Sequence, residues 1–266
     1  MTKESIIDAS KPNAGRMYDY YLGGSHNFEV DRQAAQQVLN LLPYVSKYAR
    51  LQRWPLQDIA VELTEKRGFD VIIDFASGLP TNDHIHHTVQ PGTTVIYSDY
   101  DPVTVQYARE ILGDIPNTYI FEGDARQTET LLNNPDVQQI LDGRRNVAFV
   151  FWGVSSFLTD TELAGNLQFL YDWAGPGSCL AFNAQTYNRD NPDVKQALAI
   201  YEKMGAKIYP RFVEEFEALI QPWELEEPGW IPLLEWSGFA QSDLAQEDAD
   251  AFGPVGSGHG AYLVKS

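Results

Sequence analysis

The feature that most constrains the fold is a series of short apolar runs that alternate with helical patterns. Continuous apolar runs are typical of strands covered on both faces, as in a parallel sheet. Alternation of such strands with helices predicts a doubly wound α/β fold. The expected strands are 71–75, 94–99, 118–121, 146–151, 179–183 and, as a last edge strand, 260–264. The expected helices are 29–41, 44–65, 82–90, 102–112, 127–142, 160–174, 192–204 and 210–220.

Charge and composition exclude several classes of protein. The 19 Lys+Arg and 37 Asp+Glu residues give a formal net charge of −18, and so acidic a surface repels nucleic-acid phosphates. No apolar stretch is long enough for a membrane span, and the N-terminus does not resemble a secretory signal. The single cysteine, Cys179, allows neither an internal disulfide nor a cysteine-rich metal cluster. We therefore expect a cytoplasmic protein without nucleic-acid or membrane partners.

Acidic residues stand at the ends of the first three predicted strands. Asp74 ends the first strand, Asp99 ends the second, and Asp124 follows the third. Asp99 comes 21 residues after Gly78 in the loop behind the first strand, a spacing that places a carboxylate beside a ribose. Tyr100 can then pack on an adenine ring, and Asp124 can accept a hydrogen bond from the adenine amino group. The pattern predicts a site for an adenosine-type ligand.

The loop after the first strand lacks the glycines of a dinucleotide-binding site. The G-x-G-x-x-G motif brings backbone N–H groups close to a pyrophosphate. Here only Gly78 remains, with Ala76 and Pro80 at the neighbouring positions. An adenosine ligand without a pyrophosphate fits best, and S-adenosylmethionine (SAM) is such a ligand. A nicotinamide-dependent oxidoreductase on the same sheet is an alternative that the missing motif disfavours.

Several blocks of the chain carry a resemblance to a known family. The Asp-x-x-x-Gly-x-Pro pattern at 74–80, the strand-end Asp99 and the Gly-Asp-Ala at 123–125 resemble class I SAM-dependent methyltransferases. The blocks 12–28, 78–81, 97–102 and 227–232 are similar, more narrowly, to an actinobacterial-type S-adenosyl methyltransferase family with largely unknown acceptors. The resemblance covers nearly the whole chain. It implies a Rossmann-like, mostly parallel sheet of seven strands with a reversed last strand.

The resemblance also implies which residues bind SAM. Asp74 and Gly78 would flank its methionine portion, Asp99 would hold the ribose, and Asp124 would hold the adenine edge. The sequence departs from the class at Ala76, where glycine is usual. The full set of expected cofactor-binding residues is Asp74, Ala76, Gly78, Asp99, Tyr100, Asp124, Ala125 and Gly153.

The segment after the fourth strand, 151–157, normally lies near the transferred methyl group in this architecture. It departs from the family's more aliphatic run with its His, and it lacks the Asn/Asp-Pro-Pro-aromatic tetrapeptide typical of DNA and amide N-methylation. We therefore expect a small-molecule acceptor, with Ser155 and Phe157 in its pocket. His86, which aligns with a family histidine, and His26 are the candidate catalytic bases. No metal is expected, because no carboxylate pair at matching spacing accompanies the histidines within 84–87.

An aromatic, glycine-containing block at 18–28 precedes the first predicted helix. It can pack its rings on the sheet edge as an irregular tail. Alternatively, it can close over the cofactor as a lid, with Gly23-Gly24 as the flexible point. The paired glycines and the many polar tips favour the lid, which would place Tyr18, Tyr21, Asn27 and Phe28 at the lid and acceptor pocket.

Together these patterns predict one methyltransferase domain spanning 1–266. Residues 1–65 are expected to form the N-terminal lid and helices, 66–190 the cofactor-binding core, and 191–266 the acceptor-side helices and last strands. The predicted reaction is direct displacement of the methyl group of SAM by an O, N or C atom of a small, moderately apolar metabolite. A non-catalytic SAM-binding protein is a second alternative, because function depends on the site and not on the fold.

Overall fold

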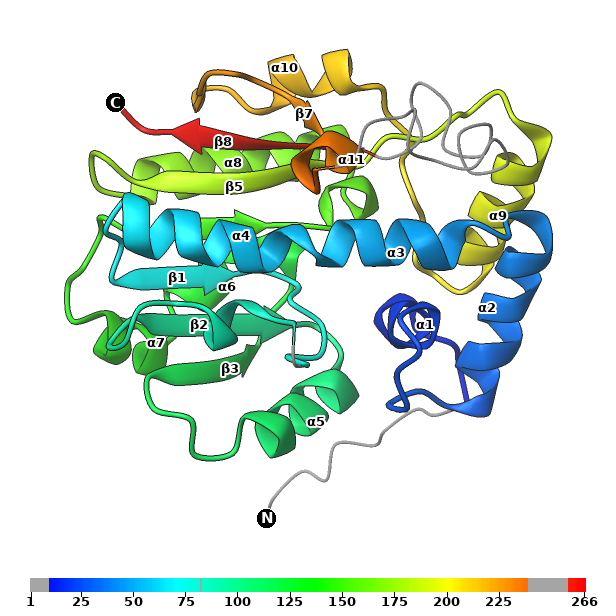
Figure 1. The fold of residues 1–266 in the computed structure, drawn as a ribbon, viewed down its shortest axis with the longest axis horizontal. Coiled ribbons are helices and arrows are strands. Elements are labelled where there is room, and N and C mark those ends of the chain that lie inside the picture. Colours follow the sequence, from blue (N-terminus) through cyan, green and yellow to red (C-terminus); the bar gives the residue numbers. More distant parts are fainter. Residues whose placement is uncertain (1–9, 82, 239–257) are drawn as a thin grey trace.

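The computed structural model describes residues 10–81, 83–238 and 258–266. A sheet forms its middle layer (Figure 1), with the strand order β3-β2-β1-β4-β5-β8-β6 and with β7 also paired to β8. The parallel strands are β1 (Val71–Asp74), β2 (Thr94–Asp99), β3 (Thr118–Glu122), β4 (Ala148–Phe151) and β5 (Cys179–Ala184). The last strand, β8 (His259–Val264), runs antiparallel to β5. The predicted α/β fold and the reversed last strand are therefore confirmed.

The strand β8 is not at the edge of the sheet, so that part of the prediction is wrong. One side of β8 pairs with β5, and the other side pairs with β6 (Glu224–Leu225) and β7 (Ile231–Pro232). Each of these strands has only two residues, and Pro228 and Gly229 lie between them. Two residues are too few to show the alternation by which strands are recognised in a sequence.

Helices cover both faces of the sheet, as a doubly wound fold requires. Successive strand residues point to opposite faces, so Ile72 packs with one layer of helices and Ile73 with the other. The first layer contains α4 (Pro55–Val61), α5 (Pro102–Leu112) and α11 (Leu233–Trp236). The second contains α6 (Thr128–Leu132), α7 (Pro135–Leu141), α8 (Asp160–Trp173) and α10 (Phe216–Leu219).

A third apolar cluster lies beyond the carboxyl ends of the parallel strands, on the right in Figure 1. It joins the N-terminal helices to a helix that follows β5. Its helices are α1 (Ala14–Tyr21), α2 (Glu29–Leu41), α3 (Val45–Arg53) and α9 (Pro192–Lys203). The segment predicted to be irregular before residue 29 is thus partly helical. Asn13 starts α1, because its side chain accepts hydrogen bonds from the backbone N–H groups of Gly15 and Arg16.

Three predicted helices are broken or absent. The helix predicted at 82–90 is only a short 3-10 turn, η2 (Ile85–His87). The helix predicted at 127–142 is divided into η3 (Ala125–Gln127), α6 and α7, because Asn134 and Pro135 begin a new helix. The helix predicted at 210–220 is reduced to η5 (Val213–Glu215) and α10.

The long helix predicted at 44–65 is nearly continuous. It consists of α3, α4 and a π-helical turn, η1 (Glu62–Lys66). Pro55 is tolerated because it is the first residue of α4, where a missing N–H group costs little. None of the helices in the described ranges has the length and apolar character needed to cross a membrane.

Candidate functional site

A cavity of about 680 Å³ lies between the carboxyl ends of the strands and the third helix cluster. Every residue predicted to bind the cofactor lies in its wall, and so do three of the six predicted lid and acceptor residues. The predicted residues that line it are Tyr18, Tyr21, Asp74, Ala76, Gly78, Asp99, Tyr100, Asp124, Ala125, Gly153 and Phe157. The predicted residues His26, Asn27, Phe28, His86 and Ser155 do not line it.

Asp99 connects the end of β2 to the loop that follows β1. Its carboxylate accepts hydrogen bonds from the backbone N–H groups of Gly78, at 3.1 Å, and Asp101, at 2.9 Å. The side chain is almost fully buried, and this burial raises the pKa of Asp99 to about 7. A buried carboxylate in a cavity wall with a strongly raised pKa is typical of a ligand-binding or catalytic site.

Asp74 is a second buried carboxylate in the cavity wall. Within the described residues it accepts no hydrogen bond, and Nε2 of His84 lies 3.8 Å from Oδ2. Burial raises the pKa of Asp74 well above its ordinary value, while the positive charge of Arg53 opposes that rise. Its oxygens therefore remain available to a ligand that carries a hydrogen-bond donor, such as the ammonium group of SAM.

The loop after β1 is held by side chains, which explains why no helix follows it. Arg53, at the end of α3, donates to the carbonyl oxygen of Leu79 at 2.8 Å and to Oγ1 of Thr81 at 2.9 Å. Nδ1 of His84 accepts from the N–H of Ile85, so its protonated Nε2 donates to the carbonyl of Ser77 at 3.2 Å. Backbone groups satisfied in this way do not need a helix. Nothing local in the sequence indicated the role of Arg53.

The loop also contains two residues with positive φ. Gly78 has φ of +66°, which glycine adopts at no steric cost. Ala76 has φ of +54°, in the left-handed region that costs an alanine about 1 kcal/mol or more. The glycine that is usual in class I methyltransferases at this position would avoid this cost. Ala76, which replaces it here, therefore has a strained backbone.

Asp124 faces the cavity but already has a partner. Arg126 donates hydrogen bonds to both of its carboxylate oxygens, at 2.6 to 3.0 Å. Partial burial acts to raise the pKa of Asp124, but the hydrogen bonds and charge of Arg126 outweigh this effect and lower it. If Asp124 binds the adenine edge as predicted, its carboxylate must accept from the adenine and from Arg126 at the same time.

A buried ion-pair cluster joins the N-terminal block to the strand ends. Arg16 of α1 contacts Asp31 of α2 and Asp101 at the start of α5, both at 2.9 Å. Asn13 donates a hydrogen bond to the hydroxyl of Tyr100 at 3.0 Å. Arg16, Asp31 and Asp101 were not predicted as site residues, although Arg16 and Asp101 lie in the family-like blocks. The cluster fixes α1 in the cavity wall.

The glycine pair after α1 forms a packed turn around Asp19. Gly23 has φ of +83°, and a Cβ atom on Gly24 would overlap the carboxylate of Asp19. The same carboxylate accepts hydrogen bonds from the N–H of His26 and from Nδ2 of Asn27. The turn explains why Asn27 does not reach the cavity. The predicted opening of a lid at these glycines stays a prediction.

Both predicted catalytic bases lie outside the cavity wall. The ring of His26 packs edge-on against Tyr107, with 5.0 Å between ring centroids. Nδ1 of His86 lies 3.0 Å from the hydroxyl of Tyr97, on the face of the sheet covered by α4. Burial and the neighbouring His87 lower the pKa of His86 to about 4. These positions give no support to a role of His26 or His86 at the acceptor, and that role stays a prediction.

Two further predicted pocket residues are held away from the cavity. Oγ of Ser155 donates to the backbone carbonyl of Asn183 at 2.7 Å, so this side chain fastens β4 to β5. Phe28 lies beneath the guanidinium of Arg16, 5.2 Å from the ring centroid. Gly153, by contrast, lines the cavity with φ of +74°, and its N–H donates to Oδ1 of Asn183. The backbone turn at Gly153, and not Ser155, forms this part of the wall.

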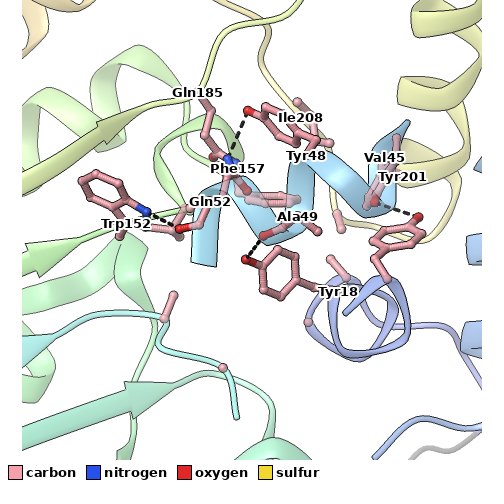
Figure 2. A pocket seen from close by; sticks show the side chains of 18 of the residues that line it. Tyr18, Val45, Tyr48, Ala49, Gln52, Trp152, Phe157, Gln185, Tyr201 and Ile208 are labelled. Atoms are coloured by element: carbon pink, nitrogen blue, oxygen red, sulfur yellow. Dashed lines mark hydrogen bonds between the residues drawn. The ribbon is translucent and has the colours of Figure 1, made fainter. Parts of the chain in front are cut away.

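Away from the strand ends, the wall of the cavity is rich in tyrosine. Figure 2 shows Tyr18, Tyr48 and Tyr201, which come from α1, α3 and α9. The hydroxyl of Tyr18 donates to the carbonyl of Ala49, and the hydroxyls of Tyr21 and Tyr201 lie 3.2 Å apart. Burial raises the pKa of each of these four tyrosines, and that of Tyr21 to about 12. They are therefore un-ionised at neutral pH and serve as neutral hydrogen-bonding groups.

The described side chains offer no evident metal site. Among them, no group of three or more His, Cys, Asp or Glu residues is arranged to hold a metal ion. Nε2 of His84 and Oδ2 of Asp74 lie 3.8 Å apart, but they form only a pair. Both ring nitrogens of His84 are already bonded to the backbone, at Ser77 and Ile85.

Comparison with known proteins places this site in a family. The model of the S-adenosyl methyltransferase family matches residues 1–258. A protein of known structure from Thermobifida fusca YX is 30% identical over 98% of this chain and 97% of that chain, with a TM-score of 0.84. A DUF574 family protein from Streptomyces avermitilis MA-4680 is 24% identical over 98% and 100%, with a TM-score of 0.86. No curated protein matches the chain in sequence.

A more distant similarity is limited to the fold. The magnesium protoporphyrin IX methyltransferase of Synechocystis PCC 6803, determined with bound S-adenosylhomocysteine (SAH), is 12% identical over 96% of this chain and 100% of that chain. Its TM-score is 0.52. The match of the family model over almost the whole chain is the decisive finding. The chain therefore belongs to the S-adenosyl methyltransferase family, whose methyl donor is SAM.

Proposed function

We propose that this methyltransferase transfers the methyl group of SAM to an O, N or C atom of a small, moderately apolar metabolite. The observation that carries the proposal is that one cavity contains both the acidic strand ends and a wall rich in un-ionised tyrosines. The strand ends offer carboxylates for the donor, and the tyrosine-rich wall offers apolar rings with polar tips for the acceptor. A volume of about 680 Å³ supports a cavity that holds both molecules together.

The reaction is a direct displacement. The acceptor atom forms a bond to the methyl carbon while the bond from this carbon to sulfur breaks, leaving SAH and, where the acceptor carried one, a proton. The protein contributes by holding the acceptor in line, which can supply on the order of 7–11 kcal/mol at best. Asp74 and Asp99 orient the donor, and the half-buried rings of Tyr18 and Tyr201 limit the access of water to the reacting atoms.

The acidic charge supports a small molecule as the partner, in place of a nucleic acid. The formal net charge is −18, and the cavity wall contains six acidic and three basic side chains. The residues Asp19, Asp74, Asp99, Asp124, Glu162 and Asp190 are the acidic ones, and Arg53, Arg126 and Lys207 are the basic ones. The same composition, with one buried cysteine, supports our proposal that the protein works in the cytoplasm.

Calorimetric titration with SAM, SAH and NADH tests the donor site first. We expect both sulfur nucleosides to bind and NADH not to bind. Asp99→Ala should weaken SAH binding by about 1.5–3 kcal/mol, because a hydrogen bond to a charged group is lost. Asp114→Ala, which changes an exposed carboxylate after α5, is the matched control and should leave the affinity unchanged.

Turnover on a panel of small metabolites then tests the acceptor. We expect formation of SAH with at least one compound that has an apolar or aromatic body and one nucleophilic O, N or C atom. Transfer only to a protein or nucleic acid would contradict the proposed acceptor class. Binding of NADH without binding of SAH would contradict the proposed donor site.

A further inference from the structure

One polar side chain in the cavity wall has a hydrogen-bonding group that none of the described residues uses. Gln185 directly follows β5 and lines the cavity, where Figure 2 shows it among the side chains of the wall. Its exposure is only 4%. Buried amide groups are nearly always hydrogen-bonded at both the oxygen and the nitrogen. The hydrogen bonds of its oxygen and of its nitrogen therefore show which of these two atoms is available to a ligand.

The oxygen end of Gln185 is fully occupied. Oε1 accepts hydrogen bonds from the backbone N–H of Ser156 at 3.2 Å and from its Oγ at 2.7 Å. Because a backbone N–H can only donate, the atom facing it must be the oxygen, and the orientation of the amide is fixed. Among the described residues, none accepts a hydrogen bond from Nε2 of Gln185.

A hydrogen-bond relay makes Nε2 a strong donor. The hydroxyl of Ser156 uses its proton on Gln185, so the hydroxyl of Tyr187, 3.3 Å from Oγ of Ser156, must donate to it. The chain therefore runs from Tyr187 to Ser156 to the oxygen of Gln185. Hydrogen bonds in such a chain polarise one another, which increases the positive charge on the N–H protons at its end.

Gln185 lies in the part of the cavity wall that we assign to the methyl acceptor. Asn183, two residues earlier, accepts a hydrogen bond from the N–H of Gly153, at the turn where we place the transferred methyl group. Ser156 lies three residues after Gly153 and holds Gln185 directly. The free N–H groups thus belong to the part of the wall that follows β4 and β5. The carboxylates Asp74 and Asp99, which we assign to the donor, follow β1 and β2.

We propose that Gln185 is a positioning and specificity residue whose Nε2 donates a hydrogen bond to a neutral oxygen of the methyl acceptor, either a carbonyl or an un-ionised hydroxyl. A carboxylate is disfavoured, because six of the nine charged side chains in the wall are acidic. The inference rests on the proposed function, since it assigns this part of the wall to the acceptor. A buried donor of this kind discriminates against ligands that leave it unpaired.

The test uses matched probes on the full chain saturated with SAH. Acetophenone carries a carbonyl oxygen, ethylbenzene has a similar shape without it, and benzoate carries a carboxylate. The dissociation constant of each probe is measured by NMR titration with protein labelled with ¹⁵N at glutamine, and the side-chain NH₂ signals of Gln185 are followed. We expect acetophenone to shift these signals and ethylbenzene to leave them in place.

Two variants separate the hydrogen bond from packing. Gln185→Met should weaken acetophenone by roughly three- to tenfold and leave ethylbenzene and SAH nearly unchanged. Gln185→Glu keeps an oxygen for Ser156 but removes the NH₂ group, and it serves the same purpose if the first variant does not fold. Gln196→Met, on the exposed side of α9, is the matched control and should change none of these constants.

Each outcome bears on one proposal. Equal weakening of acetophenone and ethylbenzene, unmoved Gln185 signals, tighter binding of benzoate, or no binding of acetophenone at millimolar concentration would each overturn the role of Gln185. Failure of SAH itself to bind the wild-type chain would instead contradict the proposed function. The two failures are therefore distinguishable.

Discussion

Arg16→Met removes a cation that joins three separate parts of the structure. Nε of Arg16 contacts Asp31, Nη1 contacts Asp101, and Nη2 donates to the carbonyl of Lys11 at 2.8 Å. The side chains of Arg16, Asp31 and Asp101 are 4%, 0% and 9% exposed. Methionine has a similar length but no charge, so two buried carboxylates would lose their counterion.

The expected loss follows from this burial. Breaking a buried ion pair by removing one partner costs about 3–5 kcal/mol, because an uncompensated charge is left behind. Asp31 keeps hydrogen bonds from the N–H groups of Asn13 and Phe28. Asp101 keeps two, from the N–H of Val103 and the hydroxyl of Thr104. Because these hydrogen bonds still stabilise both carboxylates, the loss of stability should stay within that range. Since whole domains are stable by about 5–15 kcal/mol, the variant should fold but unfold at much lower denaturant concentration.

Urea unfolding followed by circular dichroism measures this loss. Lys66→Met is the matched control, because Lys66 forms an exposed pair with Glu62 at 2.7 Å and should cost about 0.5 kcal/mol or less. Adding Asp31→Asn to Arg16→Met should restore part of the stability, since one unpaired charge is removed. A loss below about 1 kcal/mol for Arg16→Met would refute the claim that this cluster anchors α1.

Three further predictions concern the turn after α1 and the donor site. Gly24→Ala should lower the free energy of unfolding by about 1–3 kcal/mol, because the new Cβ overlaps the carboxylate of Asp19; an unchanged unfolding midpoint would contradict this packing. Ala76→Gly should raise the free energy of unfolding by about 0.5–1 kcal/mol by relieving the positive φ, and calorimetric melting that shows destabilisation would contradict the strain. Burial raises the pKa of Asp99 to about 7, so the protonated carboxyl group predominates below that pH and accepts hydrogen bonds from the ribose less well. The affinity for SAH should therefore increase by up to about tenfold per pH unit from pH 5.5 to 7 and level off above pH 7. Asp99→Asn should flatten this profile in calorimetric titrations, and a profile that persists would assign the titration to another group such as Asp74.

Much of the donor site could be predicted from local sequence patterns. Apolar runs located the strands, and the residue that ends each run is placed by the strand itself at the carboxyl edge of the sheet. Asp74, Asp99 and Asp124 therefore line the cavity as residues of neighbouring strand ends. This inference succeeds because the carboxyl ends of parallel strands meet at one edge, whatever the rest of the chain does.

Patterns failed where a segment depends on distant side chains. In place of the predicted helix at 82–90 there is only the short turn η2, and the loop before it is held by the distant Arg53 through the carbonyl of Leu79. The candidate base His86, which was chosen by its alignment with a family histidine, lies outside the cavity wall. Two-residue strands such as β6 also cannot be recognised in the sequence, since they form only when β8 supplies their hydrogen-bonding partners.

The sequence by itself determined the α/β fold and the strand-end carboxylates that line the cavity, since both depend on strand periodicity and on short spacings. Only the tertiary structure decided the rest of the site. Arg16 reaches Asp101 across 85 residues, and Arg53 reaches Leu79 across 26. Ser156, 29 residues earlier, occupies the oxygen of Gln185 and leaves its Nε2 as the end without an acceptor in the described part of the chain. Such contacts arise when packing brings separate elements together, and no local pattern encodes them.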